Sequence, residues 1–98
     1  MSAKTEVVNQ RDEHYDVYIG RGSFWGNPFV IGKDGTREEV IQKYLEYLWS
    51  RRLEEGMIDR LLELEGKTLG CFCKPLPCHG DVIIKAVKWA RRRKDEQR

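Results

Sequence analysis

The densest group of reactive side chains lies in CFCKPLPCHGD, residues 71–81, which holds Cys71, Cys73, Cys78 and His79. These are all three cysteines of the chain and one of its two histidines. Three thiols and an imidazole have the number and the chemistry for a closed zinc site. Structural zinc sites, however, usually pair cysteines with two to four residues between them, and adjacent Cys78 and His79 are poorly placed to share one ion. The spacing therefore argues against a zinc site, which stays one of the alternatives.

Two further hypotheses explain the same residues. In the first, Cys78 and His79 are catalytic, because a helix N-terminus favours a thiolate and histidine titrates near neutrality, where it can act as acid or base. In the second, Cys71 and Cys73 are small core residues and Cys78 caps the helix. The residues alone leave zinc, a polar or thiol site, and core packing as three open alternatives.

A second candidate region is the segment at residues 20–35, which is rich in glycine and aromatic residues. Its glycines miss the spacing of a dinucleotide-binding loop, and a proline stands where the helix of such a loop should begin. Its donors and rings instead suit the stacking of a base and the binding of its phosphate or edge. The candidate side chains are Arg21, Ser23, Trp25 and Asn27. The alternative is that the aromatic residues anchor this long loop to the core.

The surrounding sequence predicts the elements that position these side chains. Apolar, partly alternating runs predict strands at residues 5–8, 15–20 and 68–73, with a short extended segment at 28–32. Helices are predicted from Thr36 to about Arg52, over 57–64, and from Gly80 onward, where apolar residues recur at helical spacing. Thr36 and Glu39 form the sequence pattern of a capping box at the first of these helices.

The order of these elements predicts an α/β fold with a small layered sheet, at least partly parallel, and about three helices. Strand 68–73 follows a helical connection, which favours a parallel and central position. The inward face of the last helix should consist of Val82, Ile83, Ala86, Val87 and Ala90. In such sheets ligands bind at the carboxyl ends of the strands, and helix N-termini attract anions. The end of strand 68–73 and the residue 20–35 loop should therefore converge on one cleft.

Composition sets limits on the class of protein. A chain of 98 residues that is 40% hydrophobic and 35% charged is expected to form a single soluble domain. It has no apolar run near the roughly 20 residues of a membrane span, and its first ten residues lack a signal-peptide pattern, so no membrane partner and a cytoplasmic location are expected. Five of its 18 basic residues fall within 88–94, so residues 91–98 are predicted to form a basic helical tail. That tail either contacts phosphates or is a solvated helix end.

Longer blocks of the sequence carry a family resemblance. The segments VVNQR, YDVYIGRGSFWGNPF, DGTREEVIQKY and LGCFCKPLPCHGD resemble the small phage and prokaryotic domain of unknown function 4326, over roughly Val7 to Ile84. The resemblance implies a compact α/β domain, often phage-borne and then located in the host cytoplasm, with no established activity. It also implies one candidate site, made of Asn9, Arg11, Arg21, Ser23, Trp25, Gly26, Asn27, Cys73, Cys78, His79 and Gly80.

Taken together, these observations predict a domain that binds a nucleotide or a nucleic-acid-derived group, with enzymatic activity left open. Trp25 would stack the base, while Arg21 and the start of the last helix would hold an anion. The alternative is a zinc-stabilised nucleic-acid-binding module without catalysis. In that case Cys71, Cys73, Cys78 and His79 would be the zinc ligands, and the basic tail would contact the nucleic acid. The sequence predicts no oligomeric state.

Overall fold

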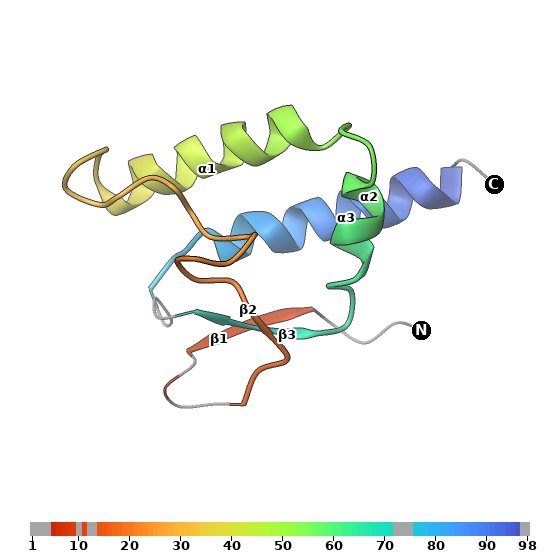
Figure 1. The fold of residues 1–98 in the computed structure, drawn as a ribbon, viewed down its shortest axis with the longest axis horizontal. Helices are drawn as coiled ribbons and strands as arrows, with labels where there is room; N and C mark the ends of the chain where they lie inside the picture. The colour runs from red at the N-terminus through yellow and green to blue at the C-terminus, as the bar shows by residue number, and fades with distance from the viewer. Residues whose placement is uncertain (1–4, 10, 12–13, 72–75, 97–98) are drawn as a thin grey trace.

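The computed structural model of the protein describes residues 5–9, 11, 14–71 and 76–96 and has the predicted α/β fold. Along the chain the elements are β1 (Glu6–Asn9), β2 (Val17–Tyr18), α1 (Arg37–Arg51), α2 (Met57–Leu62), β3 (Thr68–Cys71) and α3 (Gly80–Glu96). The described strands form one parallel sheet in the order β1-β3-β2. All three helices lie on the same side of this sheet (Figure 1). The prediction of a small parallel sheet with about three helices is confirmed.

The central strand is β3, as the sequence predicted, although its residues 72 and 73 lie outside the described residues. Leu69 and Cys71 are fully buried on the helix side of the strand. Gly70 points the other way, and a Cβ at that position would lie 2.5 Å from the ring of Tyr15. The absent side chain therefore lets Tyr15 pack directly on the strand and cover its second face.

One predicted strand is shorter than expected, and one predicted extended segment forms no strand. β2 pairs only through Val17 and Tyr18, because the chain turns away after Ile19 into a tight turn closed by the Ser23 amide and the Gly20 carbonyl, 3.1 Å apart. The segment 28–32 is not a strand and has a single isolated bridge between Ile31 and Gly35. Its amides are used locally instead, since the Val30 amide donates to the Asp34 carboxylate at 2.7 Å.

Helix α1 begins where its capping residues predict. The capping box of α1 is complete: the Glu39 amide donates to Thr36 Oγ1 at 3.2 Å, and the Thr36 amide donates to Glu39 Oε1 at 2.9 Å. These hydrogen bonds hold the pKa of Glu39 below its usual value. Helix α2 ends at Leu62, two residues before the predicted end. Tight turns follow it, and Gly66, with φ of 77°, completes the connection to β3.

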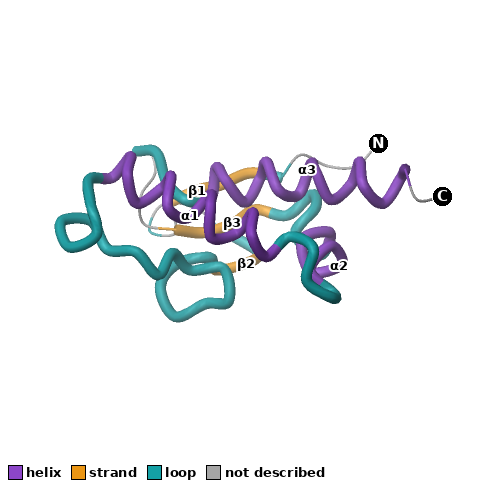
Figure 2. Tube along the Cα trace, turned by 90° about the horizontal axis from the view of Figure 1, so that it is seen from above, coloured by secondary structure: helices purple, strands orange, loops and turns teal. Residues whose placement is uncertain are grey.

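Helix α3 packs its apolar face on the sheet and runs continuously to Glu96. Its buried apolar side chains are those the sequence predicted: Val82, Ile83, Ala86, Val87 and Ala90. Gly80, at its first turn, is in close contact with the sheet, since a Cβ there would lie 2.8 Å from Val7 Cγ2 and 2.9 Å from Ile19 Cδ1. Viewed from above, α1 and α3 both lie over the strands (Figure 2). No helix in the described part of the chain combines the length and the apolar character that a bilayer crossing requires.

Candidate functional site

A cavity of about 190 Å³ opens at the carboxyl ends of β2 and β3, beside the starts of α1 and α3. Its polar and reactive lining side chains are Arg21, Asn27, Arg37, Cys71, Cys78 and His79. Its apolar and aromatic lining side chains are Tyr18, Phe29, Ile31, Val40, Ile41 and Pro77. This is the edge of a parallel sheet at which α/β proteins bind their ligands.

His79 fixes the loop that forms one wall of the cavity. Its Nε2 lies 2.7 Å from the carbonyl oxygen of Ile19, and because a carbonyl only accepts, Nε2 carries the hydrogen. The imidazole packs edge-on against Tyr44, with ring centroids 4.9 Å apart, and the Tyr44 hydroxyl donates to the Trp25 carbonyl at 2.8 Å. His79 and Tyr44 therefore hold the chain at both Ile19 and Trp25, the two ends of the turn that presents Arg21.

Burial sets the charge states of these two rings. Burial lowers the pKa of His79, and the nearby carbonyls of Ile19 and Trp25, which favour the charged ring, oppose that shift without reversing it. The imidazole is thus neutral near pH 7. Burial also raises the pKa of Tyr44 well above its usual value, so its phenol stays protonated and remains a donor. The loop is held by neutral, desolvated hydrogen bonds.

The two described cysteines meet on the cavity wall. Cys71 at the end of β3 and Cys78 before α3 are both buried, and their Sγ atoms are 3.5 Å apart. The Gly80 amide donates to Cys78 Sγ at 3.3 Å. Among the described residues no three histidine, cysteine or acidic side chains gather in a way that could hold a metal ion. Cys73 lies outside the described residues, so the zinc site stays a prediction that metal analysis of the purified protein tests.

The amide groups at the start of α3 already have acceptors inside the protein. The Cys78 amide donates to the Asp81 carboxylate at 3.3 Å, and the amides of Val82 and Ile83 donate to the His79 carbonyl at 3.0 and 3.1 Å. The helix start was predicted to hold an anion together with Arg21. Its geometry gives these amides a capping role, so the positive charge available to a ligand comes from side chains.

Two arginines supply that charge. Arg21 extends from the loop after β2, and its guanidinium has no carboxylate within ion-pair distance among the described residues. Arg37, at the first position of α1, donates from Nη1 to the Pro77 carbonyl at 3.2 Å. Neither aspartate nor glutamate occurs among the described residues that line the cavity. The cavity is therefore electropositive.

The structure brings together five of the residues singled out from the sequence: Arg21, Asn27, Cys71, Cys78 and His79. Asn27 has a mainly structural position. Its side-chain amide donates to the Val40 carbonyl at 3.2 Å and its Oδ1 accepts from the Phe29 amide at 2.9 Å. It thereby ties the loop to α1 and orients Phe29 toward the cavity.

Other predicted site residues shape the loop rather than line the cavity. The indole of Trp25 is only 7% exposed and belongs to the core, so the alternative of a loop anchor describes it and base stacking does not. The Ser23 hydroxyl donates to the Gly20 carbonyl at 2.7 Å. A Cβ at Gly26 would lie 2.7 Å from the same carbonyl oxygen, so glycine lets the turn close.

The remaining predicted residues lie elsewhere or cannot be placed. Asn9 ends β1, and its Oδ1 accepts from the Arg11 amide at 2.9 Å. Neither residue lines the cavity, and Gly80 serves as the contact point between α3 and the sheet. Cys73 lies outside the described residues.

Sequence reasoning missed Arg37, together with the aromatic walls Tyr18 and Phe29. Arg37 carried one usable signal: it is a cation in the first turn of a helix, where the helix dipole favours acidic residues such as its neighbours Glu38 and Glu39. A charge in an unfavourable local position suggests a role outside the helix. The two rings carried no comparable signal.

Comparisons with known proteins bear on the chain as a whole. The family model described as Domain of unknown function (DUF4326) matches residues 3–89. The chain belongs to this family. The match spans all of the described residues that line the cavity, from Tyr18 to His79.

Two relatives of this DUF4326 chain come from viruses. An uncharacterized 12.4 kDa protein in the nrdA-td intergenic region of Enterobacteria phage T4 is 46% identical over 84 residues, which cover 83% of this chain and 75% of the phage protein. The uncharacterized protein R718 of Acanthamoeba polyphaga mimivirus is 36% identical over 103 residues, covering 87% of this chain and 73% of the relative. No solved structure matches the chain.

Proposed function

We propose that this DUF4326 chain binds a small organic anion, of the nucleotide or nucleic-acid-derived class, in the cavity at the carboxyl ends of β2 and β3. The observation that carries the proposal is the presence of Arg21 and Arg37 on one cavity whose described lining residues include no carboxylate. A bound anion would supply the missing counter-charge.

The arginines are suited to phosphate or carboxylate groups. A guanidinium has five N–H donors in a planar fork that binds two oxygens at once. Arg37 donates to the Pro77 carbonyl, which orients its side chain and leaves further donors for a ligand. The loop that carries Arg21 is fixed by His79 and Tyr44, so part of the ordering cost of binding is already met by the fold.

The rest of the lining suits an apolar or planar group. The rings of Tyr18 and Phe29 and the side chains of Val40 and Ile41 supply apolar surface next to the two cations. The volume of about 190 Å³ is below the roughly 300–1,000 Å³ of cavities that enclose drug-sized ligands. The ligand is therefore a single ring with one anionic group, or a larger nucleotide of which only one part enters the cavity.

Cys78 and His79 act in this proposal by positioning the cavity wall. Cys78 is buried against Cys71, and the Nε2 hydrogen of His79 is used by the Ile19 carbonyl. We assign neither residue a bond-making step. Binding is the activity that we propose.

Calorimetric titration tests the proposal. The panel consists of inorganic phosphate, ribose 5-phosphate, nucleosides and nucleoside monophosphates. We expect a nucleoside monophosphate to bind more tightly than its nucleoside or phosphate alone. Arg21→Ala and Arg37→Gln should each weaken it about 10- to 100-fold, as expected for the loss of a charge-assisted hydrogen bond of roughly 1.5–3 kcal/mol.

The matched control is Lys33→Ala, which removes an exposed cation that does not line the cavity. It should leave the affinity unchanged. The proposal fails if no anion in the panel binds, or if both arginine variants bind as tightly as the unaltered protein.

A further inference from the structure

Trp49, near the end of α1, pairs with Trp89, in the middle of α3. Trp49 of α1 and Trp89 of α3 have ring centroids 5.7 Å apart and planes inclined by 56°, and both are only partly buried. Twelve residues of helix, about 18 Å at 1.5 Å per residue, separate Trp49 from Arg37 at the cavity. This aromatic pair is therefore a surface feature distinct from the proposed ligand site.

A cation is held over both rings. The guanidinium carbon of Arg52 lies 5.1 Å from the ring centroid of Trp49 and 5.8 Å from that of Trp89. Its Nη1 donates to the Trp49 carbonyl at 2.6 Å, which fixes the side chain in this position. Cation–π attraction accounts for the geometry and keeps the charge at the surface.

Three more cations flank Trp89 on α3. Lys85 and Arg92 stand four residues before and three residues after Trp89, so both lie one turn from it on the same face. Lys88 continues the stripe between them, and all three are exposed. The stripe covers about 10 Å of helix, from Lys85 to Arg92.

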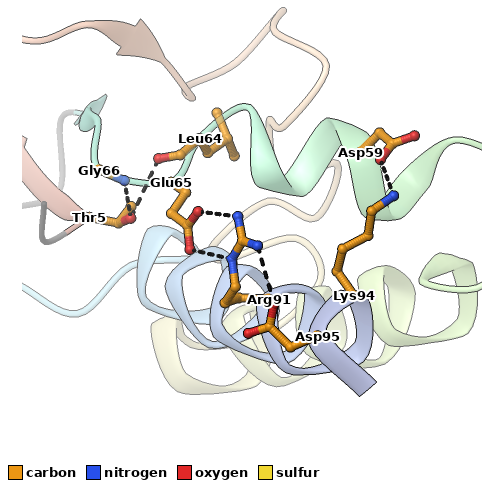
Figure 3. Close-up of polar contacts among 8 residues, drawn as sticks. All are labelled: Thr5, Asp59, Leu64, Glu65, Gly66, Arg91, Lys94 and Asp95. Atoms are coloured by element: carbon orange, nitrogen blue, oxygen red, sulfur yellow. Dashed lines mark hydrogen bonds and ion pairs between the residues drawn. The ribbon is translucent and has the colours of Figure 1, made fainter. Parts of the chain in front are cut away.

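The structure divides the basic residues of α3 into two groups. Arg91 binds Glu65 through two hydrogen bonds, of 3.0 and 2.7 Å, and Lys94 lies 3.5 Å from Asp59, so these two cations connect α3 to α2 and its following turn (Figure 3). In contrast, Lys85, Lys88, Arg92 and Arg93 of α3 form no ion pair with any described residue, and neither does Arg52 at the end of α1.

Several carboxylates, including Asp81 and Asp95, lie within one turn of this surface, and none forms an ion pair with its cations among the described residues. Glu46 is three residues before Trp49 and lies 3.5 Å from the side-chain amide of Gln42, while Glu96 is exposed at the end of α3. Like charges one turn apart on a helix repel each other, which makes the stripe slightly unfavourable for folding alone. The aromatic–basic ridge is defined as Trp49, Arg52, Lys85, Lys88, Trp89 and Arg92. Three of its cations, Lys85, Lys88 and Arg92, form no ion pair with any described residue.

We propose that the aromatic–basic ridge binds single-stranded nucleic acid. Exposed cations spaced along a helix match the repeated phosphates of a flexible strand, and partly exposed indoles give unpaired bases a surface to stack on. Neither feature needs the cavity, so this inference is independent of the proposed small-ligand site. The paired cations Arg91 and Lys94 are not part of the interface.

Fluorescence anisotropy of a labelled 12-nucleotide oligothymidylate, measured at several salt concentrations, tests the ridge. With four phosphate contacts, the slope of log K against log salt should be about −3. Lys88→Ala combined with Arg92→Ala should reduce the steepness of that slope by about 1.4 and weaken binding by about tenfold or more at low salt. Trp89→Phe, which keeps an apolar ring, should reduce the quenching of tryptophan fluorescence by the oligonucleotide.

The matched control removes the same charge elsewhere: Lys33→Ala combined with Lys67→Ala should bind like the unaltered protein. Arg21→Ala should also bind normally, which separates the ridge from the cavity. An equal loss of affinity in the two double variants would overturn the proposal, because binding would then depend on net charge and not on the ridge. The ridge proposal would also be overturned if the oligonucleotide did not bind at 50 mM salt. It would be overturned as well if duplex DNA bound as tightly as the single strand and tryptophan fluorescence did not change.

Discussion

The two ends of α3 are held in the protein by different forces. At its first turn, His79 and Gly80 are buried and contact the sheet and loop through a neutral hydrogen bond and close apolar packing. In its last turns, Arg91 and Lys94 are held by carboxylates at the protein surface (Figure 3). The first end fixes the shape of the cavity, and the second end fixes α3 against α2.

This difference predicts how each end responds to change. Removing one partner of a buried hydrogen bond leaves the other unsatisfied in a medium without water, whereas a surface ion pair exchanges its partner for water and salt ions. The arginines of the cavity follow neither pattern, because they are placed by a rigid loop and a helix start yet have no carboxylate partner among the described residues. Rigid placement of an unneutralised charge is what distinguishes the cavity end.

The largest effect is expected for His79→Ala. The change leaves the Ile19 carbonyl without its donor and removes a ring that packs against Tyr44, so the free energy of unfolding should fall by about 2–4 kcal/mol. His79→Gln keeps a side-chain donor and should cost less. Urea denaturation measures both. A loss below about 1 kcal/mol for His79→Ala would mean that His79 does not hold the loop.

Gly80→Ala should have the next largest effect. Alanine favours a helix over glycine by about 1 kcal/mol, but the new methyl group would clash with Val7 and Ile19. We expect a net loss of about 1–2 kcal/mol in the free energy of unfolding. A double-mutant cycle with Val7→Ala should show partial recovery. Unchanged or increased stability of Gly80→Ala would contradict the close contact.

The pH dependence of stability should separate the two ends further. Because burial lowers the pKa of His79 below its usual 6.5, the unfolded chain takes up a proton first as the pH falls through that value, while the folded protein keeps a neutral ring. The stability associated with His79 is thus present above pH 6.5 and declines below it, by at most about 1.4 kcal/mol per pH unit. His79→Gln should show a shallower decline between pH 6.5 and 5. Parallel curves for the two proteins would contradict a buried, neutral imidazole.

Glu65→Gln should have the smallest effect. The Arg91 guanidinium holds the pKa of Glu65 below its usual 4.5, so the pair stabilises the fold above that pH and its contribution is lost as the pH falls further. At neutral pH the change in the midpoint of urea denaturation should be smaller than for His79→Ala and should decrease as salt is added. A salt-independent loss as large as that of His79→Ala would reverse the comparison of the two ends.

Much of the fold could be predicted from local sequence. The order of strands and helices, the central place of β3 and the buried face of α3 follow from apolar periodicity, and the start of α1 follows from its capping box. The short β2 and the absence of a strand at 28–32 could not be predicted in this way. They depend on where a turn closes at Gly20 and on a hydrogen bond from Val30 to Asp34, for which an apolar run gives no signal.

The site was predicted in part. The convergence of the residue 20–35 loop with the start of α3 follows from the parallel sheet, whose strands end at one edge. The roles of individual residues in the site do not follow from the sheet topology, because an aromatic residue in a loop can either stack on a ligand or fill the core. Trp25 is buried while Phe29 lines the cavity, and this choice depends on packing against α1. Arg37 is the first residue of α1 and follows the residue 20–35 loop directly, so the path of that loop determines whether Arg37 lines the cavity.

Amide chemical-shift mapping tests the central claim most directly. The ¹⁵N-labelled protein is titrated with the nucleoside monophosphate that binds best, and shifts are followed residue by residue. The account predicts that the largest shifts cluster at Gly20, Arg21, Asn27, Arg37 and His79, with the amides of residues 88–96 unchanged. Largest shifts on residues 88–96, or binding without any shift around the cavity, would contradict a ligand site at the carboxyl edge of the sheet.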